Sequence, residues 1–216
     1  IYEYNSRQNG NPHRGSHILA IAASEAYDGS KEVVRKFINA KSTREVIYTR
    51  NTTESLNLIA RSYGETHLQK GDRIVITVAE HHANLVTWQR VAQKTGAVLD
   101  YIYIDKKTGK FQEEAFAKID ANTKIVAFAQ VSNVLGLVFD PKPLINLAHQ
   151  HGAVVVLDGA QSVPHQQVDV QKLDCDFFVF SGHKMCASGG IGVLYGKEAL
   201  LEDMEPFNLG GDMIDR

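Results

Sequence analysis

The chain has little of what several classes of protein require. It contains two cysteines, Cys175 and Cys186, which are too few for a disulfide framework and lack metal-ligand spacing. Its formal net charge is −2, so it has no basic surface of the kind that binds nucleic acid or an anionic membrane. No apolar run approaches the length of a membrane span, and the start shows no signal-peptide pattern. These absences predict a cytoplasmic protein without nucleic-acid or membrane partners.

Two common phosphate-binding motifs are also absent. No Gly-x-Gly-x-x-Gly follows the first apolar run, and no Walker lysine motif occurs. A nucleotide is therefore not the expected ligand. What the chain does have is the composition of a globular protein with a sizeable core, with 44% hydrophobic and 22% charged residues.

Short β-branched apolar runs alternate with helical patterns along the chain. Several runs are apolar nearly throughout, which is typical of strands buried on both faces. The alternation predicts the α/β class, with a mainly parallel seven-stranded sheet and helices on both faces. Strands are expected at Glu45–Thr49, Arg73–Thr77, Val98–Ile104, Lys124–Gln130, Ala153–Asp158, Phe177–Ser181 and Gly192–Tyr195. Helices are expected at Ser16–Asn39, Thr53–Tyr63, Asn84–Lys94, Glu113–Ile119, Pro143–His151 and Lys197–Met204.

Polar segments follow five of the predicted strands. In a parallel α/β sheet, ligands bind beyond the carboxyl ends of the strands, so all of these segments fall where a site is expected. They are Thr49–Glu54, Ala79–His82, Gln130–Asn133, Asp158–Gln161 and Ser181–Lys184.

Asp158 and Lys184 are the pair that suggests a chemistry. Asp158 ends one apolar run, and Lys184 follows another after a short polar turn. Pyridoxal phosphate needs a lysine that holds its aldehyde as a Schiff base and a carboxylate that keeps its pyridine nitrogen protonated. A metal or a neighbouring lysine is the alternative partner for a buried Asp158. The pairing predicts pyridoxal phosphate as cofactor and Lys184 as a catalytic residue.

The threonines Thr52 and Thr53 stand between a strand and a helix. Hydroxyls and free N–H groups at a helix start suit a phosphate, although a simple N-cap has the same sequence pattern. Ser181 and His183 are placed to donate to the same phosphate.

His81 also lies between a strand and a helix, where an imidazole can stack on a cofactor ring or shuttle protons. On pattern alone, His82 is an equal candidate. The amides of Asn133 and Gln161 suit the phenolate oxygen of a cofactor ring, or they satisfy loop backbone groups instead.

His13 and Arg14 belong to a polar segment near the start of the chain. His13 and His17 are four residues apart, a spacing that binds zinc on a helix face. However, Gly15 separates them and no metalloprotease glutamate follows. We expect no metal, and instead a loop at the mouth of the site with Arg14 and one of the histidines near the substrate.

Six motifs occur in a characteristic order: Asn11–His17, Thr52–Asn57, Ala79–Asn84, Val131–Gly136, Leu157–Ser162 and Ser181–Lys184. Together they resemble the large domain of the cysteine desulfurases that feed iron–sulfur cluster assembly. These enzymes belong to the pyridoxal-phosphate-dependent, fold-type-I, class V aminotransferases. The resemblance implies one cofactor-binding large domain over residues 1–216, with its start and a C-terminal small domain missing.

The resemblance also implies roles for single residues. They are a Schiff-base lysine at Lys184, a pyridine-nitrogen partner at Asp158, a donor to the ring oxygen at Gln161, a stacked ring at His81, a substrate-carboxylate contact at Asn133, and a phosphate cradle from Thr53, Ser181 and His183. Family members convert L-cysteine to L-alanine, leave a persulfide on an enzyme cysteine and pass the sulfur to an acceptor protein. They are homodimers.

Two departures from the family pattern matter. Cys186–Gly190 stands where relatives carry a Gly-Pro-Thr-Gly run. The persulfide cysteine and a substrate-binding arginine are expected in a C-terminal segment that this chain lacks, so the chain alone is expected to be inactive and both Cys175 and Cys186 to be structural. The alternatives are another class V enzyme (selenocysteine lyase, kynureninase or aminotransferase), a noncatalytic domain, or a metal hydrolase.

Overall fold

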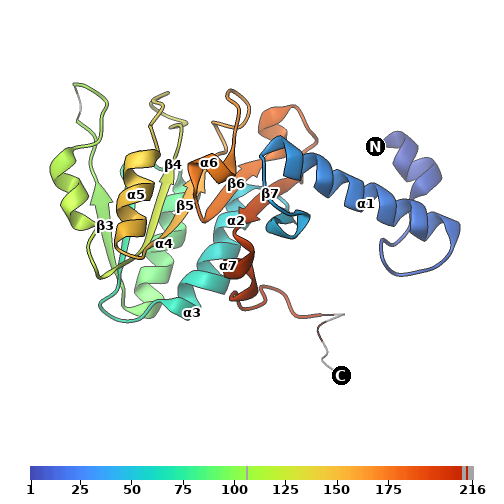
Figure 1. Cartoon of the computed structure of the whole chain (residues 1–216), viewed down its shortest axis with the longest axis horizontal. Coiled ribbons are helices and arrows are strands. Elements are labelled where there is room, and N and C mark those ends of the chain that lie inside the picture. Colours follow the sequence, from blue (N-terminus) through green and yellow to red (C-terminus); the bar gives the residue numbers. More distant parts are fainter. Residues whose placement is uncertain (106, 211–212, 214–216) are drawn as a thin grey trace.

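The computed structural model describes residues 1–105, 107–210 and 213, and the rest of the predicted range 1–216 lies outside them. A seven-stranded sheet with the order β1-β7-β6-β5-β4-β2-β3 forms its centre (Figure 1). Among the described strands, β7 alone runs opposite to the others, so that only its pairs with β1 and β6 are antiparallel, which confirms the mainly parallel sheet. The strands are β1 (Val46–Thr49), β2 (Arg73–Thr77), β3 (Val98–Ile102), β4 (Thr123–Ala129), β5 (Val154–Asp158), β6 (Phe177–Ser181) and β7 (Gly192–Gly196).

Helical segments precede, connect and follow these strands. The α-helices are α1 (Ile18–Phe37), α2 (Thr52–Ile59), α3 (Glu65–His67), α4 (His82–Thr95), α5 (Lys142–Gln150), α6 (Val170–Leu173) and α7 (Glu198–Glu202). Two segments are π-helical, η1 (Tyr4–Gln8) and η3 (Ala60–Gly64). Three are 3₁₀ helices, η2 (Thr43–Glu45), η4 (Glu113–Lys118) and η5 (Gly182–Met185).

Several predicted boundaries were wrong, for local reasons. The expected strand Val98–Ile104 ends at Ile102, because its one neighbour β2 ends at Thr77, the register partner of Ile102. The expected helix Glu113–Ile119 is the 3₁₀ segment η4, whose last turn closes with an Ile119 N–H to Phe116 C=O bond of 2.9 Å. The expected helix Thr53–Tyr63 divides into α2 and the π-helical η3, and α6 was not predicted.

The central strands bury both of their faces, and β2 shows the pattern. Ile74 and Ile76 belong to a cluster that contains Trp88 of α4, whereas Val75 between them belongs to a cluster with Leu144 of α5. Fully burying one such aliphatic side chain is worth about 1.5–3 kcal/mol. The prediction of helices on both faces is therefore confirmed, with α2 and α4 on one side and α5 and α6 on the other.

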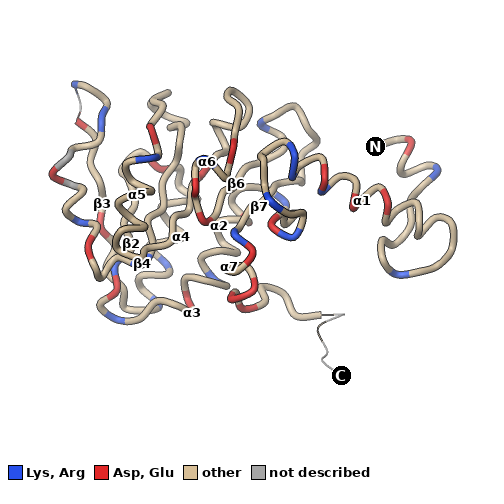
Figure 2. The backbone as a smooth tube through the Cα atoms, in the orientation of Figure 1, with Lys and Arg blue, Asp and Glu red and all other residues tan. Residues whose placement is uncertain are grey.

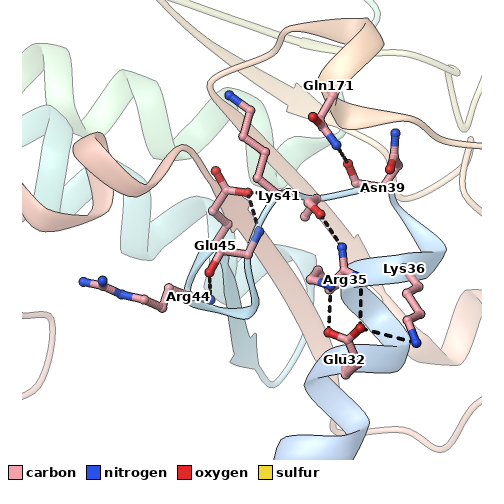
Figure 3. A network of polar contacts seen from close by, with 10 residues as sticks. Glu32, Arg35, Lys36, Asn39, Lys41, Arg44, Glu45 and Gln171 are labelled. Atoms are coloured by element: carbon pink, nitrogen blue, oxygen red, sulfur yellow. Dashed lines mark hydrogen bonds and ion pairs between the residues drawn. The ribbon is translucent and has the colours of Figure 1, made fainter.

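A polar network fixes the entry into β1 (Figure 3). Arg35 near the end of α1 donates to the Ala40 C=O at 2.9 Å and is held by Glu32 at 2.7 Å. Glu45 accepts the Lys41 N–H at 2.8 Å and completes a capping box around η2. These contacts set where β1 begins, and the end of β1 leads directly into α2.

Acidic and basic residues are interspersed along the described backbone, in keeping with the small net charge (Figure 2). None of the described helices combines the length and the apolarity needed to cross a membrane. Helix α1 extends away from the sheet, and the N-terminal segment folds back beside its outer part (Figure 1).

Candidate active site

The carboxyl ends of β5 and β6 lie side by side. The two strands pair in parallel, with Asp158 opposite Val179. Asp158 is the last residue of β5, and β6 ends at Ser181, after which η5 carries Lys184. The acid and the lysine therefore leave neighbouring strands at one edge of the sheet, as the sequence predicted.

Successive side chains of a strand point to opposite faces of the sheet, and this alternation determines the face on which Asp158 and Ser181 lie. Val156 and Val179 pack in the cluster that contains Leu56 of α2 and Trp88 of α4. Asp158 lies two residues beyond Val156, so it has the same face, and Ser181 follows Val179 in the same way. The starts of α2 and α4 are thereby brought over the ends of β5 and β6.

A cavity of about 170 Å³ lies at this meeting point. Most of the predicted cofactor residues line it, together with three that the sequence did not single out. The lining consists of Asn51, Thr52, Thr53, His81, Ala83, Asp158, Ala160, Ser181, His183 and Lys184.

The start of α2 is built to receive an anion. Asn51 is its N-cap and accepts the Glu54 N–H at 2.9 Å, so neither threonine caps the helix. The Thr52 N–H donates to Ser181 Oγ at 2.8 Å, and the two hydroxyls share a hydrogen bond of 2.7 Å. Among the described contacts, this leaves the Thr53 N–H as the helix-start donor without a protein acceptor. A free N–H at a helix start attracts negative charge.

Asp158 is a buried carboxyl group to which no cationic side chain among the described residues is bonded. It is 5% exposed, and its Oδ1 accepts the Ala160 N–H at 2.8 Å. Burial raises its pKa, while the Ala160 N–H and the charges of Lys184 and His81 lower it. A cationic ligand atom beside Asp158 would offset the cost of burying its charge.

His81 is the N-cap of α4, and its ring orientation is set by that role. Its Nδ1 accepts the Ala83 N–H at 3.1 Å, so the neutral ring carries its proton on Nε2. His81 lines the cavity and His82 does not, which separates two histidines that were equal on pattern.

Other predicted site residues lie outside the cavity lining. Asn133 is exposed in the turn after β4, and Gln161 is half-buried beyond β5. His13, in the loop before α1, contacts Asp28 at 3.3 Å and packs edge-on against Tyr27. The functional roles of all these residues stay predictions.

Arg14 shares that loop with His13, and its predicted role near the substrate also stays a prediction. His17 accepts the Ala20 N–H and caps α1. Within the described part of the chain, no group of three or more His, Cys, Asp or Glu side chains is placed to hold a metal ion.

The sequence reasoning missed Asn51 and Glu80. Asn51 precedes Thr52 by one residue and Glu54 by three, a helix-start pattern that would have identified it. Glu80 immediately precedes His81 and follows β2. A carboxylate buried beside an apolar strand needs hydrogen-bond donors or a cation, because burying its charge without them is costly.

The two cysteines differ in environment. Cys175 is fully buried, and burial together with the nearby Asp176 raises its pKa, so it is no thiolate at neutral pH. Cys186 is exposed and lines a neighbouring cavity of about 770 Å³, to which Lys184 also contributes. Its predicted structural role stays a prediction.

The parallel sheet with an acid and a lysine at its carboxyl edge is the large-domain architecture of fold-type-I pyridoxal-phosphate enzymes. The sequence pattern of the aminotransferase class-V family matches residues 1–216. The chain therefore belongs to the aminotransferase class-V family.

The names of similar proteins within this family specify an activity, that of a cysteine desulfurase. A probable cysteine desulfurase of Halalkalibacterium halodurans is 52% identical over 213 residues, covering 99% of this chain and 52% of the relative. The apo structure of a cysteine desulfurase from Thermococcus onnurineus superposes with a TM-score of 0.93 at 40% identity, covering 100% of this chain and 53% of that one. A cysteine desulfurase from Escherichia coli gives a TM-score of 0.89 at 41% identity, covering 100% and 54%. The chain spans about half the length of the relatives it matches.

Proposed function

We propose that this chain is the cofactor-binding large domain of a pyridoxal-phosphate-dependent cysteine desulfurase, an enzyme that converts L-cysteine to L-alanine and retains the sulfur as a persulfide. The observation that carries the proposal is the convergence of Lys184 and the buried Asp158 on one cavity beside the free start of α2. The identity of about half with proteins named cysteine desulfurase supports the choice within the family.

The residues present suit this cofactor. No cationic side chain of the described residues is bonded to Asp158, and a protonated ring nitrogen would supply a cation there. The Thr53 N–H and the hydroxyls of Thr52 and Ser181 form a cradle of the right chemistry for a phosphate. His183 lines the same cavity. When bound, pyridoxal phosphate supplies an electron sink for charge that develops on the substrate α-carbon.

The side chains of this chain would divide the work. Lys184 would hold the cofactor through its amine and, once that amine is free again, would move a proton to or from the substrate α-carbon. Asp158 would keep the ring nitrogen protonated, and His81 would pack against the ring. Gln161, Asn133, His13 and Arg14 are proposed to contact the ring oxygen or the substrate.

The remaining features of the full enzyme are also proposals. The nucleophilic cysteine is proposed to lie outside this chain, because Cys175 is buried with a raised pKa and Cys186 does not line the cavity of Asp158. A sulfur-acceptor protein of iron–sulfur assembly would then collect the persulfide sulfur. We also propose that the protein is cytoplasmic and that it forms a homodimer. The homodimer is supported by the exposed apolar side chains of Ile18, Ile21 and Val33 on α1.

The test is the visible absorbance of cofactor attached to a lysine. In the full-length protein, Lys184→Ala should abolish the band and the release of alanine from cysteine. Lys172→Ala, at an exposed lysine of α6, should leave both unchanged. A band that survives Lys184→Ala, or a wild-type protein that takes up no cofactor, would contradict the proposal.

A further inference from the structure

Glu80 is a carboxyl group enclosed between the ends of β2 and β4 and the start of α4. Its Oε1 accepts hydrogen bonds from the Thr77 hydroxyl and from the Ala129 N–H, the latter at 3.1 Å. Its Oε2 accepts from Asn84 Nδ2 at 2.7 Å. The side chain therefore ties together three elements that meet behind the cavity.

Each of these partners is held in the role of donor. The Ala129 N–H can only donate. Asn84 cannot rotate its amide, because its Oδ1 accepts the indole N–H of the fully buried Trp88 at 2.8 Å. The Thr77 oxygen accepts the Ala79 N–H at 3.2 Å, which leaves its hydrogen for Glu80. Both carboxylate oxygens at position 80 are thus required as acceptors.

The network adjoins two residues of the cavity, His81 and Asp158. His81 follows Glu80 directly and begins α4. Ala129 is the register partner of Asp158 across the β4–β5 pair, so its backbone is fixed beside that acid. A side chain that bonds to Ala129 and to the first turn of α4 sets the separation of His81 from Asp158.

We propose that Glu80 is a positioning residue that holds His81 and Asp158 at the spacing a ligand between them requires. It contacts no ligand itself and does not line the cavity. The inference rests on the proposed function for the identity of the ligand. The spacing itself can be tested without any ligand.

The substitution Glu80→Gln keeps the shape of the side chain but replaces one of its two acceptor oxygens by an NH₂ group. That group then faces a donor, which is Asn84 Nδ2 in one orientation of the amide and the Ala129 N–H in the other. A buried donor left without an acceptor loses its hydration and gains no hydrogen bond in return. Combining Glu80→Gln with Asn84→Asp exchanges the acid and the amide, and it restores an acceptor for each donor, including the Trp88 indole. Thr77→Val removes the donor of Thr77 and also the acceptor of the Ala79 N–H, and it changes no charge. Glu65→Gln, which breaks an ion pair to Lys94 at the other end of α4, is the matched control.

Two readouts decide the proposal in the full-length protein, both taken above the raised pKa of Glu80, where its carboxylate is ionised and accepts at both oxygens. One is the affinity for pyridoxal phosphate. The other is the set of ring-nitrogen signals of His81 in the cofactor-free protein, assigned by comparison with His81→Gln. Glu80→Gln should weaken cofactor binding about tenfold and move the His81 signals, because the fixed spacing is lost. The exchange of acid and amide should return both to near wild-type values, and Thr77→Val should weaken binding about threefold.

Unchanged affinity and unchanged His81 signals in folded Glu80→Gln would overturn the proposal, as would an exchange variant that restores neither. A lower midpoint of unfolding with no change in either readout would show a purely structural role and would also overturn it. If Glu80→Gln does not fold, Thr77→Val and the exchange variant decide by the same two readouts. A wild-type protein that binds no cofactor defeats the proposed function, whereas the His81 signals still test the spacing.

Discussion

At the scale of single residues, burial determines how the acids around the cavity behave. Removing a carboxylate from water disfavours its charged form. For Glu80 this effect, together with the like charge of Asp158, outweighs the three hydrogen bonds it accepts and raises its pKa to about 7. Burial also raises the pKa of Asp158, although Lys184 and His81 oppose the change. The favourable charges act on Asp158, whereas neutral hydrogen-bond donors alone lower the pKa of Glu80.

The raised pKa of Glu80 predicts a pH dependence of stability. Between its ordinary value of 4.5 and about 7, the folded protein holds a proton that the unfolded chain has lost. The free energy of unfolding should therefore fall as pH rises through this window, by about 3 kcal/mol from this group. Urea unfolding of the cofactor-free protein at pH 5 and pH 7.5 measures the difference. Glu80→Gln should remove most of this fall, and Glu65→Gln should retain it; equal slopes in wild type and Glu80→Gln would show that the pKa is ordinary.

The two cysteines should differ in reactivity for a similar reason. Cys186 is exposed, whereas Cys175 is fully buried with its pKa raised by burial. A thiol reagent added to the native protein should modify Cys186 within minutes and Cys175 only after unfolding. Cys186→Ser should then leave no fast-reacting thiol among these two positions. Rapid labelling of Cys175, identified by peptide mass, would contradict its place in the core.

At the scale of elements, the position of α2 depends on a close approach by β7. A Cβ added at Gly192 would lie 2.5 Å from the Cα of Asn51, the N-cap of α2. This explains why a glycine stands where β7 begins. The start of α2, which is proposed to hold a phosphate, therefore packs directly against the backbone of β7, a strand that is distant in sequence.

Gly192→Ala should push the start of α2 away from β6. Because Asn51 meets the new methyl group through backbone atoms, we expect a loss of about 1–3 kcal/mol in the free energy of unfolding and weaker binding of pyridoxal phosphate. Thermal unfolding and a cofactor titration measure these effects. Gly189→Ala is the control, since nothing lies within 4 Å of its added Cβ. Equal behaviour of the two variants would mean that α2 moves freely over β7.

At the scale of the whole molecule, α1 leaves an apolar face uncovered. Of its 20 residues, Ala20 and Ala23 are the buried ones, while Ile18 and Ile21 are 82% and 48% exposed. Ile18, Leu19 and Ile21 are exposed apolar side chains within one turn of the helix, and exposed apolar side chains that gather in this way are typical of an interface. It is the structural support for the proposed homodimer.

Replacing Ile18 and Ile21 together by aspartate should shift the full-length protein from dimer to monomer. Charged side chains placed in an apolar interface lose hydration without gaining partners. Sedimentation equilibrium measures the change. Val86→Asp, at a 55% exposed position of α4, adds charge elsewhere and should leave the mass unchanged. A double variant that remains dimeric would place the interface away from α1.

Much of the fold follows from local patterns in the sequence. Apolar runs identified β2 and β6 to the residue, and Pro143 and Gly152 marked the first turn and the end of α5. Short or irregular segments such as η4 lacked a distinctive period and were assigned wrongly. Helix and strand ends depend on neighbours that a local pattern does not contain.

The chain by itself determined which residues can do chemistry: an acid ending one buried strand and a lysine following the next. Only the tertiary structure decided which side chains share the cavity. It joined Thr52 to Ser181 across 129 residues and Glu80 to Ala129 across 49, and it left Asn133 and Gln161 outside the lining. The reason is physical: periodicity and caps act within a few residues, whereas strand order and buried hydrogen bonds form between segments that only the folded core brings together.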